Sequence, residues 1–89
     1  MNVEFITPEK KMFTGEATGV KLPGIKGSFE ILSNHAPLIS ALGKGVVRIT
    51  TAKEGALHLQ ITGGFVEVLN NSVVVLAESA KMLNDNAKR

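Results

Sequence analysis

The residues best suited to chemistry lie in one short segment of the chain. Ser33 and His35 supply a hydroxyl and an imidazole, and Glu30 is the nearest acid in the sequence. A hydroxyl, an imidazole and a carboxylate are the components of a hydrolytic triad. A triad needs fixed geometry from separate elements, usually in a cleft, and an 89-residue chain offers little room for one. We therefore expect no catalytic activity and assign no catalytic residue.

Other ligand-binding patterns are weak. The second histidine, His58, is distant from His35, and the chain has no cysteine, so no metal-ligand spacing is present. Glycines recur in close pairs, but none forms a phosphate-binding loop ahead of a helix. We expect no metal, no cofactor and no small-molecule substrate.

Charge and aromatic content argue against a nucleic-acid partner. Ten Lys and Arg residues against eight Asp and Glu residues give a net charge of +2. All four phenylalanines fall in predicted strands, where core packing accounts for them, and there is no tyrosine or tryptophan. A barrel that binds single strands needs exposed stacking rings in a basic groove, so this class of partner is disfavoured.

The polar segment is also a corner in the chain. Ser33-Asn34-His35 is followed by Ala36-Pro37. Pro37 lacks a backbone donor and moves Ala36 out of helical angles, and Asn34 tolerates a left-handed conformation. The pattern predicts a rigid, exposed turn between two apolar segments. The same residue types dominate ordinary turns, so a docking corner and a plain turn both remain open.

The elements that must position this corner are strands, because apolar and polar residues alternate with a period of two. Turn signals occur at Pro8-Glu9, Pro23-Gly24, 43–45, 53–55 and Asn70-Asn71. The predicted strands are 2–7, 11–14, 16–22, 27–32, 38–42, 46–51, 57–62, 65–69 and 72–77. Short strands with frequent turns predict an all-β fold, an antiparallel sandwich or a barrel.

Two segments depart from this alternation. Val73–Leu76 is apolar on both faces, which predicts a strand between other elements and an apolar surplus that a partner could cover. Residues 79–89 are polar, with Met82, Leu83 and Ala87 on one helical face, so we expect a short, frayed or helical tail. We divide the chain into a sandwich, residues 1–78, and this tail, residues 79–89. The longest aliphatic run is too short to span a bilayer, so any work at a membrane would depend on another protein.

The residues also resemble a known family. GSFEILSNHAPLISALGKGVVRI and LQITGGFVEVLNNSVVVLAESA are similar to the N-terminal domain of the epsilon subunit of F-type ATP synthase, which is called delta in mitochondria. The combination of NHAPL at Asn34–Leu38 with GGFVEV at Gly63–Val68 is specific. The resemblance implies a ten-stranded antiparallel β-sandwich in the rotor's central stalk. Such a subunit is non-catalytic and couples c-ring rotation, driven by proton flow, to ATP synthesis through the gamma subunit.

The resemblance also implies partners and contacts. The partners are the gamma subunit and the c-ring, at the cytoplasmic face of the bacterial plasma membrane. The c-ring contacts would be Ser28, Glu30, Ser33, Asn34 and His35, and the gamma contacts would be Thr7, Met12, Phe13 and Ser40. The family usually has Gly where Glu30 stands and often Pro where Ser33 stands, so a basic residue on the ring is expected to face Glu30.

The family usually continues into a helical hairpin that can inhibit ATP hydrolysis and, in some members, binds ATP. The chain stops at Arg89, and Leu83–Ala87 gives only an incomplete ATP-site motif. We therefore expect neither hairpin inhibition nor ATP sensing. A free-standing adaptor or ligand-binding sandwich is the alternative, followed by a nucleic-acid barrel and, last, an enzyme.

Overall fold

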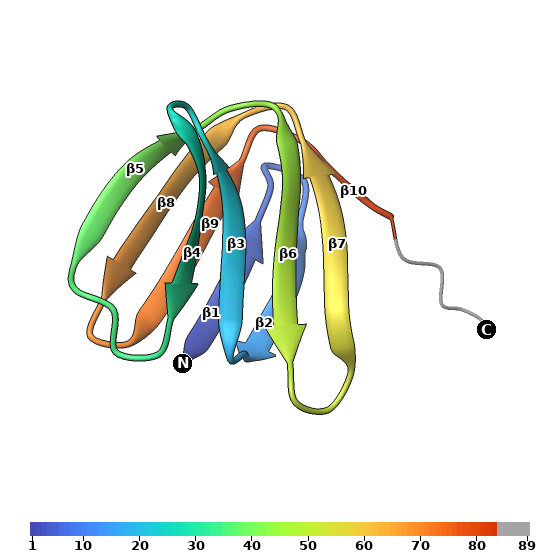
Figure 1. Ribbon diagram of the computed structural model, residues 1–89. Helices are drawn as coiled ribbons and strands as arrows, with labels where there is room; N and C mark the ends of the chain where they lie inside the picture. Colours follow the sequence, from blue (N-terminus) through green and yellow to red (C-terminus); the bar gives the residue numbers. More distant parts are fainter. Residues whose placement is uncertain (84–89) are drawn as a thin grey trace.

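The computed structural model describes residues 1–83, and its regular elements in that range are all β-strands (Figure 1). No helix able to cross a membrane occurs within this range. The strands are β1 (Asn2–Ile6), β2 (Lys11–Glu16), β3 (Gly19–Gly24), β4 (Gly27–Leu32), β5 (Leu38–Leu42), β6 (Gly45–Thr51), β7 (Gly55–Ile61), β8 (Gly64–Leu69), β9 (Ser72–Ala77) and β10 (Ala80–Met82).

The ten strands form one continuous sheet that curls into two layers (Figure 1). The first layer has the order β5-β8-β9-β1-β2, and the second has the order β4-β3-β6-β7-β10. The layers join where Gly24 of β3 pairs with Leu42 of β5. This arrangement confirms the predicted all-β sandwich with ten strands.

The expectation of a purely antiparallel sheet is wrong for one pair of strands. β1 and β9 run parallel, with Val3 opposite Val73 and Phe5 opposite Val75. These strands come from opposite ends of the chain and are not joined by a hairpin, so nothing forces them to be antiparallel. The pairing places β9 between β8 and β1, as predicted for a strand between other elements.

The alternating residues separate into an interior and an exterior, as the period of two predicts. On β6 and β7, Val47 faces Leu59 and both are fully buried, whereas Arg48 faces His58 on the outside. The same alternation holds in both layers and fills the space between them. The largest fully buried side chains are Phe5, Leu22, Ile31, Ile49, Leu59 and Ile61.

The predicted hairpin turn at Asn70-Asn71 is confirmed. Both residues have positive φ angles, 52° and 60°, as a two-residue turn of this type requires, and asparagine tolerates that region better than most residues.

The predicted turn at Pro23-Gly24 is wrong, because both residues lie in β3. The loop consists instead of Ile25 and Lys26, and Gly24 pairs with Gly27 across it. A Cβ atom on Gly24 would lie 2.6 Å from the Gly27 oxygen. Gly24 therefore permits a close approach of two strands rather than a turn.

Several other strand ends differ from the prediction by one or two residues, and the differences are larger around residues 14–19 and in the tail. Glu16 ends β2, and the next strand begins only at Gly19. Ala80–Met82 forms β10 beside β7, so the expected frayed or helical tail is wrong for these three residues. The edge of β7 offers unpaired backbone groups, and a short strand satisfies them better than an isolated turn of helix. Ala87, the last residue of the predicted helical face, lies outside the described residues.

Candidate functional site

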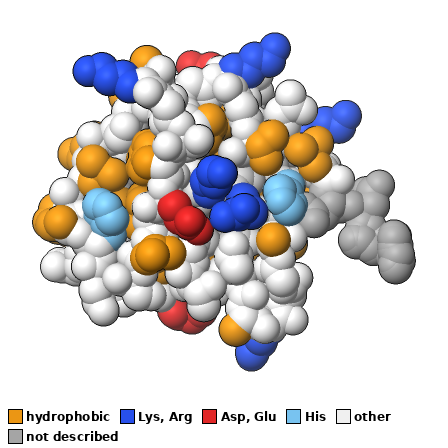
Figure 2. All heavy atoms as spheres, in the orientation of Figure 1, with side chains coloured by type: hydrophobic (Ala, Val, Ile, Leu, Met, Phe, Trp, Pro, Cys, Tyr) orange, Lys and Arg blue, Asp and Glu red, His pale blue; other side chains and the backbone are white. Residues whose placement is uncertain are grey.

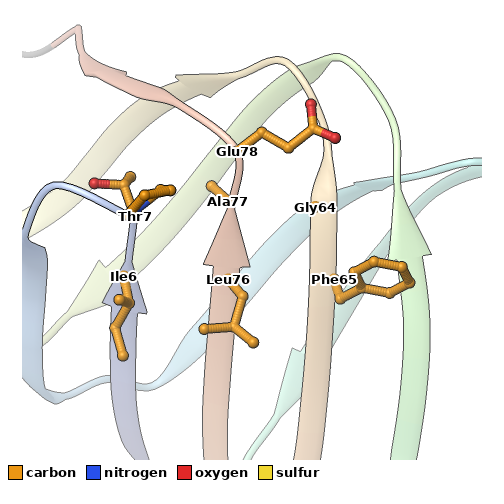
Figure 3. A pocket seen from close by; sticks show the side chains of 8 residues that line it. Ile6, Thr7, Gly64, Phe65, Leu76, Ala77 and Glu78 are labelled. Atoms are coloured by element: carbon orange, nitrogen blue, oxygen red, sulfur yellow. The ribbon is translucent and has the colours of Figure 1, made fainter.

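The outer surface of the first layer carries several large apolar side chains that are exposed. Ile6 of β1, Leu76 of β9 and Phe65 of β8 lie in one row on neighbouring strands (Figure 3). Ala41 of β5 continues that row beside Phe65. Together with other apolar residues that point outward they form what we call the apolar face, which consists of Ile6, Ile39, Ala41, Phe65, Leu69, Val74 and Leu76. Two acidic residues share this side of the sheet, because Glu67 lies between Ile39 and Val74, and Glu4 lies opposite Val74.

The apolar face is well exposed. Ile39 is 74% exposed, Phe65 58% and Leu76 51%. At the end of the row, a hollow of about 320 Å³ lies between Ile6, Phe65 and Leu76 and is bordered by Thr7 and Glu78. A group of large apolar side chains exposed on one side of a small domain is typical of an interaction site.

Close packing of two strands beneath the face depends on one glycine. A Cβ atom on Gly64 would fall on the carbonyl oxygen of Leu76 in β9. Only glycine allows β8 and β9 to approach so closely at this point. A Gly-Gly pair beside a strand, as at Gly63-Gly64, is typical of a bulge or a close backbone approach, and at Gly64 the structure shows the close approach.

The prediction that the phenylalanines pack in the core is wrong for Phe65. Phe5 is fully buried, and Phe13 and Phe29 pack partly buried against the core, but Phe65 lies on the apolar face. Val66 is buried, and successive side chains of a strand point to opposite faces, so the side chain of the preceding residue, Phe65, points outward. The sequence did contain a signal that some apolar strand residues would be exposed, because it has more apolar strand faces than one core can bury.

The polar corner is exposed and is fixed by hydrogen bonds. Asn34 adopts a left-handed φ of 65°, and its backbone N–H donates to Oδ1 of Asn71 over 2.7 Å. His35 Nδ1 lies 2.7 Å from the Ala36 carbonyl oxygen, which can only accept, so Nδ1 carries the proton. Both ring and backbone are therefore held in position at the end of the sandwich that also carries the β8–β9 turn.

The hydrogen bonds at the corner do not form a catalytic triad. The Glu30 carboxylate pairs with Arg48, with Oε2 3.4 Å from Nη2, and His35 Nδ1 is engaged by a backbone carbonyl. Within residues 1–83, no group of three or more histidine and acidic side chains could hold a metal ion.

The five residues implied as c-ring contacts do not lie at one place. Ser28 is near the start of β4, Glu30 is at its middle, and Ser33 to His35 follow its end. β4 is extended, so the start of the strand and the corner lie at opposite ends of one layer. The structure brings Ser33, Asn34 and His35 together and leaves Ser28 apart from them.

The four residues implied as gamma contacts are also separated. Thr7 borders the hollow beside the apolar face. Ser40 lies on β5 between Ile39 and Ala41, two residues of the apolar face. Its strand partner is the buried Val66, so the Ser40 side chain points inward. Met12 and Phe13 lie on the edge strand β2, where both pack partly buried against the core.

Comparison with known proteins identifies the family. The sequence profile for the ATP synthase Delta/Epsilon chain, beta-sandwich domain, matches residues 1–82. An ATP synthase epsilon chain from Salinibacter ruber is 43% identical over 91% of this chain, which spans 60% of that relative's length. The epsilon chain from Chlorobium limicola is 42% identical over 85% of this chain, which spans 86% of its length.

Solved structures agree on the fold. A chain in the Euglena gracilis mitochondrial ATP synthase, in a complex of OSCP, F1 and c-ring, superposes with a TM-score of 0.85 at 16% identity. That match covers 93% of this chain and 53% of the other. A chain from the central stalk and c-ring of Tetrahymena thermophila mitochondrial ATP synthase gives 0.78 at 17% identity, covering 99% of this chain and 73% of the other. The chain therefore belongs to the ATP synthase delta/epsilon family, and residues 1–82 form its β-sandwich domain.

Proposed function

We propose that this protein is a non-catalytic subunit of the central stalk of an F-type ATP synthase, coupling proton-driven rotation of the c-ring to ATP synthesis through the gamma subunit. The apolar face is the observation that carries this proposal. A surface with Ile39, Phe65 and Leu76 all at least half exposed is unfavourable in water and is stabilised when a partner covers it.

The apolar face is the surface we assign to the gamma subunit. It extends over four adjacent strands, which gives a broad surface that reaches well beyond the hollow between Ile6, Phe65 and Leu76. A stable contact needs roughly 1,000 Å² or more of total buried surface, and this face with its polar border supplies the apolar centre of such an interface. Of the gamma contacts implied by the resemblance, Thr7 and Ser40 lie closest to the face.

The polar corner is the surface we assign to the c-ring. It is exposed, held in position by hydrogen bonds, and lies at an end of the sandwich rather than on a broad face. Amide and imidazole groups at fixed positions suit contact with polar loops, because they donate and accept hydrogen bonds without requiring a buried charge. Ser28 and Glu30 are then peripheral to this contact.

The fold suits transmission of torque. Its close-packed interior resists compression, so a force applied at one surface reaches another without much deformation of the domain. No bond in a substrate is broken by this protein in the proposed role. In the proposed role the protein lies at the cytoplasmic face of the bacterial plasma membrane and is held there by its partners.

A pull-down of this chain with the gamma subunit and the c-ring tests the proposal. We expect capture of gamma by the chain alone, and of the c-ring by the chain together with gamma. Failure to capture gamma, combined with binding to an unrelated protein or a small ligand, would favour a free-standing adaptor.

A double substitution tests the corner. Asn34→Ala with His35→Ala removes the polar side chains but leaves the strands unchanged, so we expect weaker c-ring attachment with unchanged gamma binding. Coupled ATP synthesis equal to that of the unmodified complex would contradict the assignment.

Cysteines placed separately at Ser28 and His35 report by crosslinking which end of the layer faces the ring. A crosslink from Ser28 alone would reverse our assignment.

A further inference from the structure

The outer surface of the second layer carries a row of charged side chains. Glu30 of β4 lies opposite Lys21 of β3, which in turn lies opposite Arg48 of β6, and Arg48 lies opposite His58 of β7. Figure 2 shows this surface, with basic side chains at its centre between an acidic side chain and a histidine. Two cations directly opposite each other destabilise a sheet, so the pairing of Lys21 with Arg48 is unfavourable for folding alone.

The single acidic residue in the row offsets only part of this charge. The Glu30 carboxylate reaches past Lys21 to Arg48, with Oε2 3.4 Å from Nη2. Lys21 has no carboxylate within ion-pair distance in the part of the chain that the structure describes. Lys21, Arg48 and Glu30 together therefore carry one uncompensated positive charge.

These side chains line a hollow. It has a volume of about 350 Å³ and is bordered by Lys21, Pro23, Ser28, Val46, Arg48 and His58, which we call the cationic hollow. Pro23 and Val46 supply apolar wall. Lys21, Ser28 and Arg48 offer an ammonium, a hydroxyl and a guanidinium, all of which can donate hydrogen bonds.

Arg48 is not optimally bonded in this arrangement. Its Nε–H is shielded from solvent and lacks a hydrogen-bond acceptor. A shielded donor without an acceptor is unfavourable, and the guanidinium gains by turning toward an anion in the hollow.

We propose that the cationic hollow binds a phosphate group. A phosphate presents more acceptor oxygens than a carboxylate and can therefore accept from the ammonium of Lys21, the guanidinium of Arg48 and the hydroxyl of Ser28 together. The hollow belongs to the second layer and the apolar face to the first, so a partner on the apolar face leaves the hollow open. The inference is independent of the proposed rotor function and stands if that function fails.

Titration of the full chain with inorganic phosphate, followed by NMR of backbone amides, tests the proposal. We expect saturable shifts confined to β3, β4, β6 and β7. Arg48→Met and Lys21→Met should each weaken phosphate binding at least about tenfold, because each removes a charge-assisted hydrogen bond. Glu30→Gln should strengthen binding, since it removes the competing carboxylate.

Matched controls separate a site from general attraction. Lys26→Met and Lys44→Met remove the same charge from loops outside the hollow and should leave the affinity within about twofold, as distant exposed charges are screened by salt. Equal loss in all four variants, or the absence of saturable shifts in the unmodified chain, would overturn the proposal. Thermal unfolding shows whether each variant is folded. If Arg48→Met does not fold, the comparison of Lys21→Met with the two control variants still tests the proposal.

A second arm distinguishes the source of the phosphate. Co-sedimentation with phosphatidic acid vesicles, compared with vesicles of phosphatidylcholine alone, detects binding to a lipid headgroup. Vesicle binding that is lost in Lys21→Met but kept in Lys26→Met assigns the hollow to lipid. Saturable binding of inorganic phosphate without vesicle binding assigns it to a free phosphate. Absence of both phosphate binding and vesicle binding excludes the site.

Discussion

Replacement of Phe65 by serine should weaken binding to the gamma subunit while leaving the fold intact. The Phe65 side chain is 58% exposed on the apolar face, and a phenylalanine side chain buries about 150–250 Å² when fully covered. Covering the exposed part therefore removes on the order of 100 Å² from water, worth at most about 3 kcal/mol. Because interface area converts incompletely into affinity, we expect a loss of about 2 kcal/mol, or roughly 30-fold in Kd.

Leu32→Ser is the matched control. Leu32 is 57% exposed, close to the value for Phe65, but it lies on β4 in the other layer. Both substitutions are at exposed strand positions and should change the free energy of unfolding by less than about 1 kcal/mol. Calorimetric titration of gamma with each variant measures the difference. Equal affinities for Phe65→Ser and Leu32→Ser would refute the assignment of gamma to the apolar face.

Three further substitutions, and a matched control for the last of them, test the scaffold. Gly64→Ala should destabilise the domain by about 2 kcal/mol or more, because the new methyl group would fall on backbone of β9; denaturant unfolding measures it. Phe5→Ala should cost about 3–5 kcal/mol by leaving a cavity in the core, which the same measurement would detect as a lower midpoint. Asn71→Gly keeps the left-handed turn but removes the acceptor for the Asn34 N–H, so amide hydrogen exchange at Asn34 should accelerate. Asn70→Gly, which keeps that acceptor, should not change it.

Local chemistry allowed much of the fold to be predicted from the sequence. Strict alternation on 57–62 placed Leu59 and Ile61 inside because a strand's side chains point to opposite faces in turn. Asn70-Asn71 predicted a two-residue hairpin because few residues adopt two successive left-handed conformations. Alternation could not decide whether Pro23-Gly24 was a turn or two strand residues, since that depends on which strand lies opposite.

The sequence by itself determined that the chain is an all-strand fold with an exposed polar corner and a surplus of apolar residues in its strands. Only the tertiary structure decided where that surplus lies, because the outer row of Ile6, Leu76 and Phe65 exists only once β1 pairs with β9 and β9 with β8. Likewise, Lys21 and Arg48 are 27 positions apart in the chain and become neighbours only through the pairing of β3 with β6. Residue types and their period are local properties, whereas the register between distant strands is set by the packing of the whole domain.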